Sequence, residues 1–122
     1  MQVMADLENG LWGSADGAAT EPSSAGATFL TAMIKGDSGN RWAVKGGDAA
    51  DAAGLATLFE GARPDGYSPM KKQGGIILGI GGDNSHGAVG TFFEGAMTAA
   101  YTSDAADTAV HANVAAAGYA LM

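Results

Sequence analysis

Glycine recurs so often along this chain that only short segments can form regular structure. The 122 residues include 20 glycines, a composition that disfavours a helical bundle and favours many turns. Between the turns, apolar and polar residues alternate with the period of two that is typical of β-strands. One alanine-rich segment differs, because Ser103 or Asp104 can cap a helix there and Gly118 can end it. We therefore expect an all-β antiparallel sandwich or jelly roll with one helix near the C-terminus.

The expected strands are short, and the turn signals between them are clear. Asn9-Gly10 is a strong hairpin signal, although the strand before it could also continue through these two residues. Six aromatic side chains are the expected bulky members of a core that is otherwise rich in alanine and glycine: Trp12, Phe29, Trp42, Phe59, Phe92 and Phe93. The helix should turn Val110 and Val114 toward that core. The expected strands cover residues 2–8, 11–12, 27–35, 41–45, 55–60, 74–80, 90–101 and 119–122, with a loop over 46–54.

Two carboxylates lie two residues apart in the first expected strand. Period two places Asp6 and Glu8 on the same face, about 6.5–7 Å apart along the chain. Such a pair is most often a solvated surface, but it is also suited to the floor of an acidic cleft. Trp12 and Trp42 could stack on sugar rings, although in a core with so few aromatic residues they are more often packing residues.

The segment 75–87 carries the other candidate site. The apolar run Gly75-Ile76-Ile77-Leu78 indicates a strand buried on both faces, and it leads into Gly79-Ile80-Gly81-Gly82-Asp83-Asn84-Ser85-His86-Gly87. Glycines allow another molecule to approach the main chain closely, and Asp83 then offers a single carboxylate to it. The same residues also suit an ordinary turn after a strand.

Charge and composition exclude several classes of function. The net charge of −7 argues against nucleic acid and anionic membranes as partners. No cysteine is present, so thiolate metal sites and cysteine nucleophiles are excluded. His86 and His111 lack zinc-motif spacing, and no metal or other cofactor is expected. No apolar run reaches the length of a membrane span, and the first residues lack a signal-peptide pattern.

Four blocks of sequence follow one another along the chain: Val3-Met4-Ala5-Asp6-Leu7-Glu8-Asn9-Gly10-Leu11, Gly61-Ala62-Arg63-Pro64-Asp65, Gly75 to Ser85, and Gly90-Thr91-Phe92-Phe93-Glu94-Gly95-Ala96-Met97. In this order they resemble the C-terminal half of the catalytic domain of family-54 glycoside hydrolases, the α-L-arabinofuranosidase B type. That resemblance implies a concanavalin- or laminin-G-like β-sandwich over a single domain, 1–122. It also implies an extracellular enzyme that removes arabinofuranosyl groups from arabinan and arabinoxylan with retention.

The resemblance also implies roles for individual residues. Glu8 would be the nucleophile and Asp83 the general acid/base, so that Asp83 protonates the leaving oxygen and later activates water. Asp6 would hold arabinose hydroxyls. The remaining expected substrate-binding residues are Asn9, Gly10, Leu11 and Gly82. The role of Glu94 stays open.

The chain departs from the family pattern in three respects. The family's domain is more than twice this length, and its vicinal disulfide cannot form here. Gly10 stands where an asparagine is expected. The expected partner is therefore an arabinose-containing polysaccharide or oligosaccharide, with a homodimer or a separately encoded N-terminal half completing the sandwich. The alternatives are a non-catalytic carbohydrate-binding module and an inactive or purely structural fragment.

Overall fold

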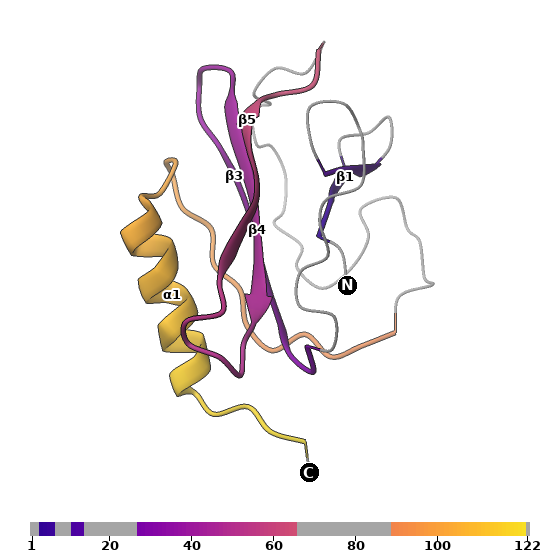
Figure 1. Cartoon of the computed structure of the whole chain (residues 1–122), viewed down its shortest axis with the longest axis vertical. Coiled ribbons are helices and arrows are strands. Elements are labelled where there is room, and N and C mark those ends of the chain that lie inside the picture. The colour runs from indigo at the N-terminus through magenta and orange to yellow at the C-terminus, as the bar shows by residue number, and fades with distance from the viewer. Residues whose placement is uncertain (1–2, 7–10, 14–26, 66–88, 122) are drawn as a thin grey trace. The chain divides into compact units, whose positions relative to one another are not determined.

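The computed structural model describes residues 3–6, 11–13, 27–65 and 89–121 (Figure 1). The chain divides into two compact units, one formed by Met1–Pro69 with Ala100–Met122 and the other by Met70–Ala99. All the regular structure that is described belongs to the first unit. Its elements are β1 (Ala5–Asp6), β2 (Leu11–Trp12), β3 (Leu30–Gly36), β4 (Arg41–Asp48), β5 (Ala56–Ala62) and α1 (Asp104–Ala116).

The main sheet is antiparallel, with the strand order β3-β4-β5. The turn between β3 and β4 follows the Gly-Asp-Ser-Gly-Asn sequence, and the Asp37 carboxylate accepts a hydrogen bond from the Arg41 N–H there. The register between β3 and β4 is continuous from Leu30 opposite Asp48 to Gly36 opposite Trp42. The register between β4 and β5 shifts between Val44 and Lys45, which indicates a β-bulge.

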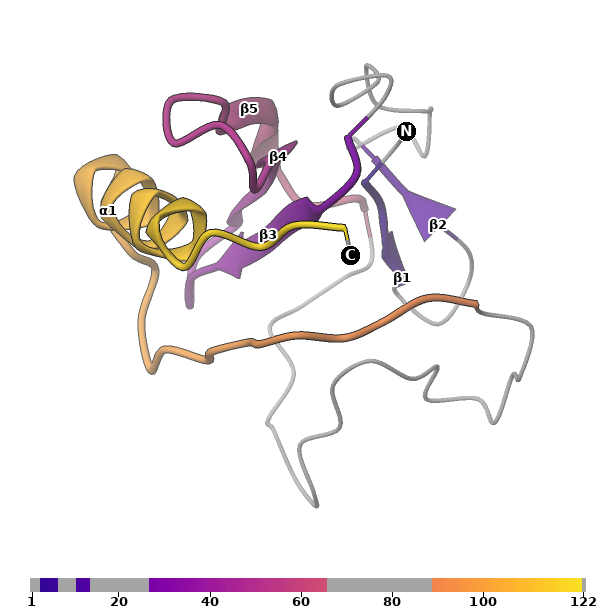
Figure 2. The ribbon, with the colours of Figure 1, turned by 90° about the horizontal axis from the view of Figure 1, so that it is seen from below.

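One face of this sheet carries the apolar core. Trp42 and Val44 are buried on it together with Val3 and Ala5 from the N-terminal segment. Trp12, Leu58 and Phe59 pack against this cluster, and the Trp42 and Phe59 rings lie 5.3 Å apart. The Trp42 indole N–H donates to the Ala62 carbonyl, so this tryptophan is a packing residue. The β1–β2 hairpin and α1 thus lie on opposite faces of the sheet (Figures 1 and 2).

The helix α1 begins and ends where its sequence predicts. The Ser103 side chain accepts a hydrogen bond from the Ala106 N–H at the N-cap, and Gly118 has a φ of +71° beyond the last turn. The prediction about its buried side was wrong for Val110, however, although Val114 is partly buried. Asp107 and His111 are the buried residues of α1, whereas Val110 is about half exposed. The helix therefore meets the sheet through polar side chains.

Several other expectations need correction. β4 continues through the expected loop at Gly46-Gly47, and a Cβ on Gly47 would lie 2.6 Å from the Gly54 carbonyl oxygen, so glycine lets the following turn approach the strand. Residues 90–101 and 119–121 form no strand. Phe92 and Phe93 are about half exposed rather than core residues. β-Propensity alone did not suffice there, because a strand also needs a neighbour with which to pair.

The fold class is confirmed at the coarse level only. The described residues form mostly antiparallel β-structure with one helix near the C-terminus. They do not establish a jelly roll or a concanavalin-like sandwich. The predicted strand 74–80 lies outside the described residues, as do residues 2, 7, 8 and 122 of the expected terminal strands.

The apolar face should be the main source of stability. Val44→Ala removes two methyl groups from a fully buried position, so we expect it to lower the free energy of unfolding by about 2 kcal/mol. Val110→Ala makes the same change at a half-exposed helix position and should alter it by less than about 0.5 kcal/mol. Urea unfolding followed by tryptophan fluorescence measures both; equal losses would contradict this assignment of the core.

Candidate active site

Most of the residues expected to carry chemistry lie outside the described residues. These are Glu8, Asn9, Gly10, Gly82 and Asp83. Asp6 and Leu11 are described through their backbones, as paired residues of β1 and β2. Glu94 is described and exposed. The pairing of Glu8 with Asp83 as catalytic carboxyl groups therefore stays a prediction.

The hairpin that carries the first candidate segment is confirmed, but its register differs from the expected one. A two-residue Asn9-Gly10 turn would place Glu8 opposite Leu11. The structure instead pairs Asp6 with Leu11 and Ala5 with Trp12, so the four residues 7–10 connect the strands. Ala5 is buried in the core cluster and Trp12 packs against it. Both ends of this connection are therefore attached to the folded unit.

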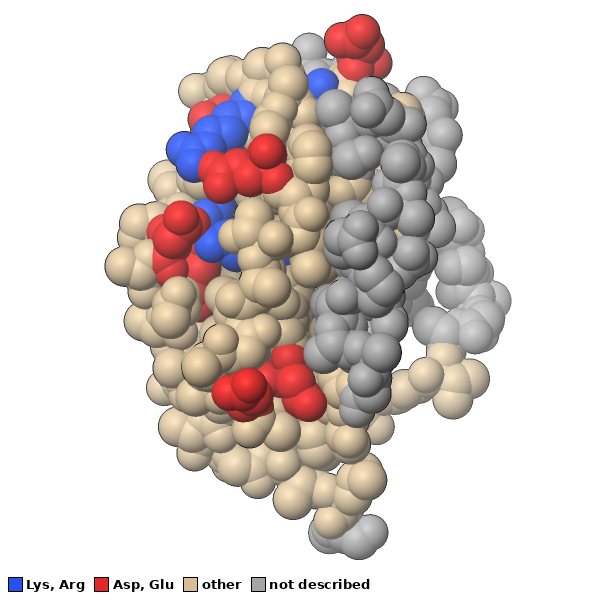
Figure 3. All heavy atoms as spheres, viewed as in Figure 1, with Lys and Arg blue, Asp and Glu red and all other residues tan. Residues whose placement is uncertain are grey.

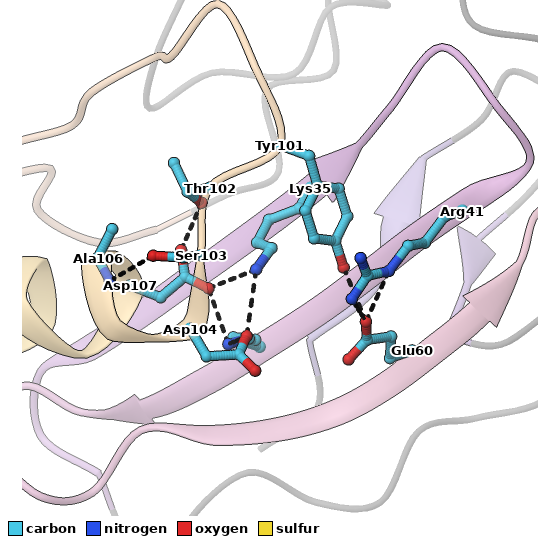
Figure 4. Close-up of polar contacts among 10 residues, drawn as sticks. Lys35, Arg41, Glu60, Tyr101, Thr102, Ser103, Asp104, Ala106 and Asp107 are labelled. Carbon is cyan, nitrogen blue, oxygen red and sulfur yellow. Dashed lines mark hydrogen bonds and ion pairs between the residues drawn. The ribbon is translucent and has the colours of Figure 1, made fainter.

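The most extensive polar contact that the structure describes joins α1 to the sheet face opposite the apolar core (Figure 4). We call its members, Lys35, Lys45, Asp104 and Asp107, the lysine–aspartate cluster. The Asp107 carboxylate lies 2.5 Å from the Lys35 Nζ and 2.8 Å from the Lys45 Nζ. Asp104 accepts a 2.6 Å hydrogen bond from Lys45 and lies 3.4 Å from Lys35. The side chains of both lysines and Asp107 are less than a tenth exposed, whereas Asp104 is 71% exposed.

The cluster shifts the ionisation of its members. Burial alone would raise the pKa of Asp107, but hydrogen bonds from Lys35, Lys45 and Thr102 outweigh it and lower the pKa from 3.8 to about 2. Burial would likewise lower the pKa of Lys45, but its hydrogen bonds to Asp104 and Asp107 raise it. A lysine with a raised pKa stays protonated at neutral pH, so Lys45 is an anchoring cation and not a nucleophile.

A second polar group lies beside the cluster and is more exposed. Arg41 donates two hydrogen bonds to the Glu60 carboxylate across β4 and β5, and Tyr101 donates a third at 3.2 Å. The hydrogen bond from Arg41 lowers the pKa of Glu60, while burial and the Glu60 charge raise the pKa of Tyr101. The Lys35 ammonium and the Arg41 guanidinium lie 4.3 and 4.4 Å from the centre of the Tyr101 ring.

These groups fix the position of α1 and of the residues that precede it. On the face drawn in Figure 3, the described lysines and arginines lie next to acidic residues.

His111 is fully buried, and its Nε2 lies 2.8 Å from the Asp51 carbonyl oxygen. Within the described ranges, no three His, Asp or Glu side chains gather as a metal site would require. The one described helix is too short to cross a membrane.

The lysine–aspartate cluster was not among the predicted sites, although the sequence carries a signal for it. Lys35 and Lys45 each interrupt a strand pattern, and the hairpin register places Lys45 opposite Met33, next to Lys35 on the same face. Two cations on one sheet face require a buried or bridging acid, and Asp104 and Asp107 share the first turn of α1. No local sequence signal, however, predicts that the first turn of α1 contacts the sheet face that carries Lys35 and Lys45.

The comparisons with known proteins identify the family of this chain. The family model described as "Alpha-L-arabinofuranosidase B, catalytic" matches residues 1–120. The chain belongs to this family. It is 55% identical to "Alpha-L-arabinofuranosidase" of Hypocrea jecorina over 98% of its length. It is also 56% identical to "Probable alpha-L-arabinofuranosidase B" of Aspergillus clavatus and 54% identical to "Arabinofuranosidase/B-xylosidase" of Trichoderma koningii, again over 98% of its length.

The predicted family resemblance is thus confirmed. The chain spans about a quarter of the length of the relatives that it matches, since each match covers 24% of the relative. No solved structure matches this arabinofuranosidase B family chain.

Removing the buried acid should detach the helix. Asp107→Asn leaves two buried ammonium groups without their main carboxylate, so we expect it to lower the free energy of unfolding by about 3 kcal/mol or more. Asp104→Asn changes an exposed acid in the same turn and should cost clearly less, because solvent screens its charge. Urea unfolding followed by circular dichroism compares the two variants. Equal losses of unfolding free energy in the two variants would show that the attachment of α1 to the sheet does not depend on the burial of Asp107.

The same carboxyl predicts an acid dependence of stability. A carboxyl group whose pKa is lower in the folded state stabilises the fold above its unfolded pKa, and this contribution is lost as the pH falls through the folded value. For Asp107 the loss should occur between about pH 4 and pH 2 and amount to roughly 2 kcal/mol. Unfolding free energies measured across this window test the sign. Asp107→Asn should lack this component, and an equally steep loss in that variant would assign it to other carboxyl groups.

Proposed function

We propose that this chain is a catalytic segment of a retaining α-L-arabinofuranosidase, with Glu8 as nucleophile and Asp83 as general acid/base. The observation that carries the proposal is the family match over residues 1–120, which includes both carboxylates and both motifs around them. The relatives' printed names support the activity, because they are arabinofuranosidases at 54–56% identity. The chain covers only about a quarter of each of these relatives, so arabinofuranosidase activity is proposed for it here and does not follow from the match alone.

The proposed reaction runs in two steps. Glu8 attacks the anomeric carbon of a terminal arabinofuranosyl group, while the carboxylic acid of Asp83 gives its proton to the leaving oxygen. Asp83, now ionised, then removes a proton from water, which attacks the same carbon and releases arabinose and Glu8. The two inversions give net retention. This mechanism requires the two carboxyl groups to lie about 5–5.5 Å apart.

The register of the β1–β2 hairpin supports this proposal, because it holds both ends of the segment that contains Glu8. Asp6 and Leu11 are held opposite each other, so the connection that carries Glu8 starts and ends at paired positions. Such support on a packed element helps a reacting group keep its geometry. Asp6, Asn9, Gly10, Leu11 and Gly82 are the proposed arabinose-binding residues. The proposed substrates are arabinan and arabinoxylan, and polymers of this size imply an extracellular site of action.

The proposal is tested in a full-length context. These 122 residues replace the matching segment of the Hypocrea jecorina relative, and hydrolysis of arabinan and of an aryl α-L-arabinofuranoside is measured. We expect Asp83→Asn to lower kcat/KM for arabinan by about 10²- to 10⁴-fold, and Glu8→Gln by at least about 10³-fold. Asp65→Asn changes an exposed acid three residues after the end of β5 and should leave activity unchanged. Full activity of Asp83→Asn would sink the assignment.

Azide separates the two roles. With an activated aryl substrate, azide should rescue Asp83→Ala and give the arabinofuranosyl azide of retained α-configuration, because it replaces water in the second step. With Glu8→Ala it should attack directly and give the inverted β-azide. Proton NMR of the products distinguishes them. Binding of arabino-oligosaccharide without turnover by the parent chimera would instead favour a non-catalytic carbohydrate-binding module.

A further inference from the structure

The outer edge of β3 presents the backbone N–H and C=O groups of four residues, and no hydrogen bond uses them within the structure's described part. β3 is the first strand of the sheet, and its only partner there is β4. Just outside its ends, the Phe29 carbonyl accepts from the Ala49 N–H, and the Asp37 N–H donates to the Arg41 carbonyl. Hydrogen bonds alternate along an antiparallel pair, so the odd-numbered residues of β3 bond to β4. The outward-facing residues are therefore Leu30, Ala32, Ile34 and Gly36.

This edge lacks the features that normally protect a sheet. β3 contains no proline or bulge, and its one charged residue, Lys35, is engaged by Asp107 on the helix side. Leu30 and Ile34 are 40% and 51% exposed, although their register partners put them on the apolar face with Val44. The opposite edge strand, β5, differs because a bulge interrupts its pairing.

We propose that the β3 edge binds the β3 edge of a second copy of this chain, antiparallel and about a two-fold axis through Met33. In that register Ala32 faces Ile34 of the second copy, and Leu30 faces Gly36 of the second copy. All four outward-facing residues then form hydrogen-bonded pairs, and the two sheets join into one. A contact of this kind is isologous, so it closes as a dimer and does not propagate.

Side-chain size favours this register. On the apolar face, the large Ile34 of one copy meets the small Ala32 of the other, while Leu30 meets Gly36, over which the Arg63 guanidinium lies. On the helix face, Thr31 comes opposite Lys35 of the second copy. The Thr31 hydroxyl is buried and has no hydrogen-bond partner among the described residues of one chain, and the new neighbour supplies a donor.

Charge is complementary in the same register. At one end of β3, the Arg63 guanidinium lies over Gly36, with its Nη2 3.1 Å from where a Cβ would be, and it donates to the Asp37 and Gly39 carbonyls. At the other end, Asp48 is the register partner of Leu30. The two-fold axis brings opposite ends together, so Arg63 of each copy approaches Asp48 of the other. No like charges of β3 face each other.

The backbone prediction is tested with Ala32→Pro and its control Ala32→Thr. Proline removes an N–H that points outward and spares the β3–β4 hydrogen bonds, while threonine keeps the N–H. Sedimentation of the 122-residue chain from about 1 to about 200 µM should show a concentration-dependent rise to twice the monomer mass for the parent and Ala32→Thr. Ala32→Pro should weaken dimerisation about tenfold or more, with an unchanged circular dichroism spectrum.

Cysteine cross-linking tests the register and does not depend on the proline variant folding. The chain has no cysteine. Met33→Cys places two thiols at a non-hydrogen-bonded pair on the axis, with Cα atoms about 4.5 Å apart and within reach of a disulfide. Thr31→Cys places them about 13 Å apart. Oxidation should give a covalent dimer for Met33→Cys alone.

Three results would overturn the proposal. The first is a parent chain that stays monomeric at the highest concentration, which would leave the edge to a strand from another polypeptide. The second is a folded Ala32→Pro variant that dimerises like the parent. The third is a covalent dimer from Thr31→Cys in place of Met33→Cys, which would exclude this register.

Discussion

The attachment of α1 depends on one buried carboxylate, Asp107, which is held between two lysine ammonium groups. A pair of buried charges is costly to desolvate, and here each charge has more than one partner. The Thr102 hydroxyl donates to the same carboxylate. Because hydrogen bonds are directional, this arrangement specifies how the helix lies on the sheet more sharply than an apolar contact would. Loss of the carboxylate would leave two lysines buried beneath the helix.

The two faces of the sheet are therefore covered through different interactions. One face excludes water with Trp42, Val44 and the N-terminal residues Val3 and Ala5. The other face binds the helix with paired charges. β4 contributes to both, because successive side chains of a strand point to opposite sides. This explains how a short strand with two glycines and a lysine can be buried along almost its whole length.

The proposed chemistry and the proposed dimer use different parts of the same unit. Glu8 belongs to the connection between β1 and β2, which pack on the apolar face. The dimer uses the free edge of β3. Among the described residues, β4 is the only strand that pairs with β3. The dimerisation and activity experiments can therefore succeed or fail separately.

The sequence by itself determined the family and the longer local elements, but not the absence of strands at 90–101 and 119–121. Alternation predicted β3, β4 and β5 to within a few residues, and the capping residues predicted both ends of α1, because these signals act over one to four residues. It also determined the family, since the matching blocks follow one another in order along the chain. It did not predict the turn register of β1 and β2, because Asn9-Gly10 is only one of several turns that can close a hairpin.

Tertiary structure alone decided which residues are buried on α1 and why. The helix pattern predicted that Val110 is buried, yet Asp107 is buried against the lysines of the sheet and His111 lies against the Asp51 carbonyl after β4. The reason is that Lys35 and Lys45 lie 72 and 62 positions before Asp107, and an unpaired buried lysine costs more free energy than an exposed valine. Only the folded chain brings these charges together, so the polar face of the helix became its inner face.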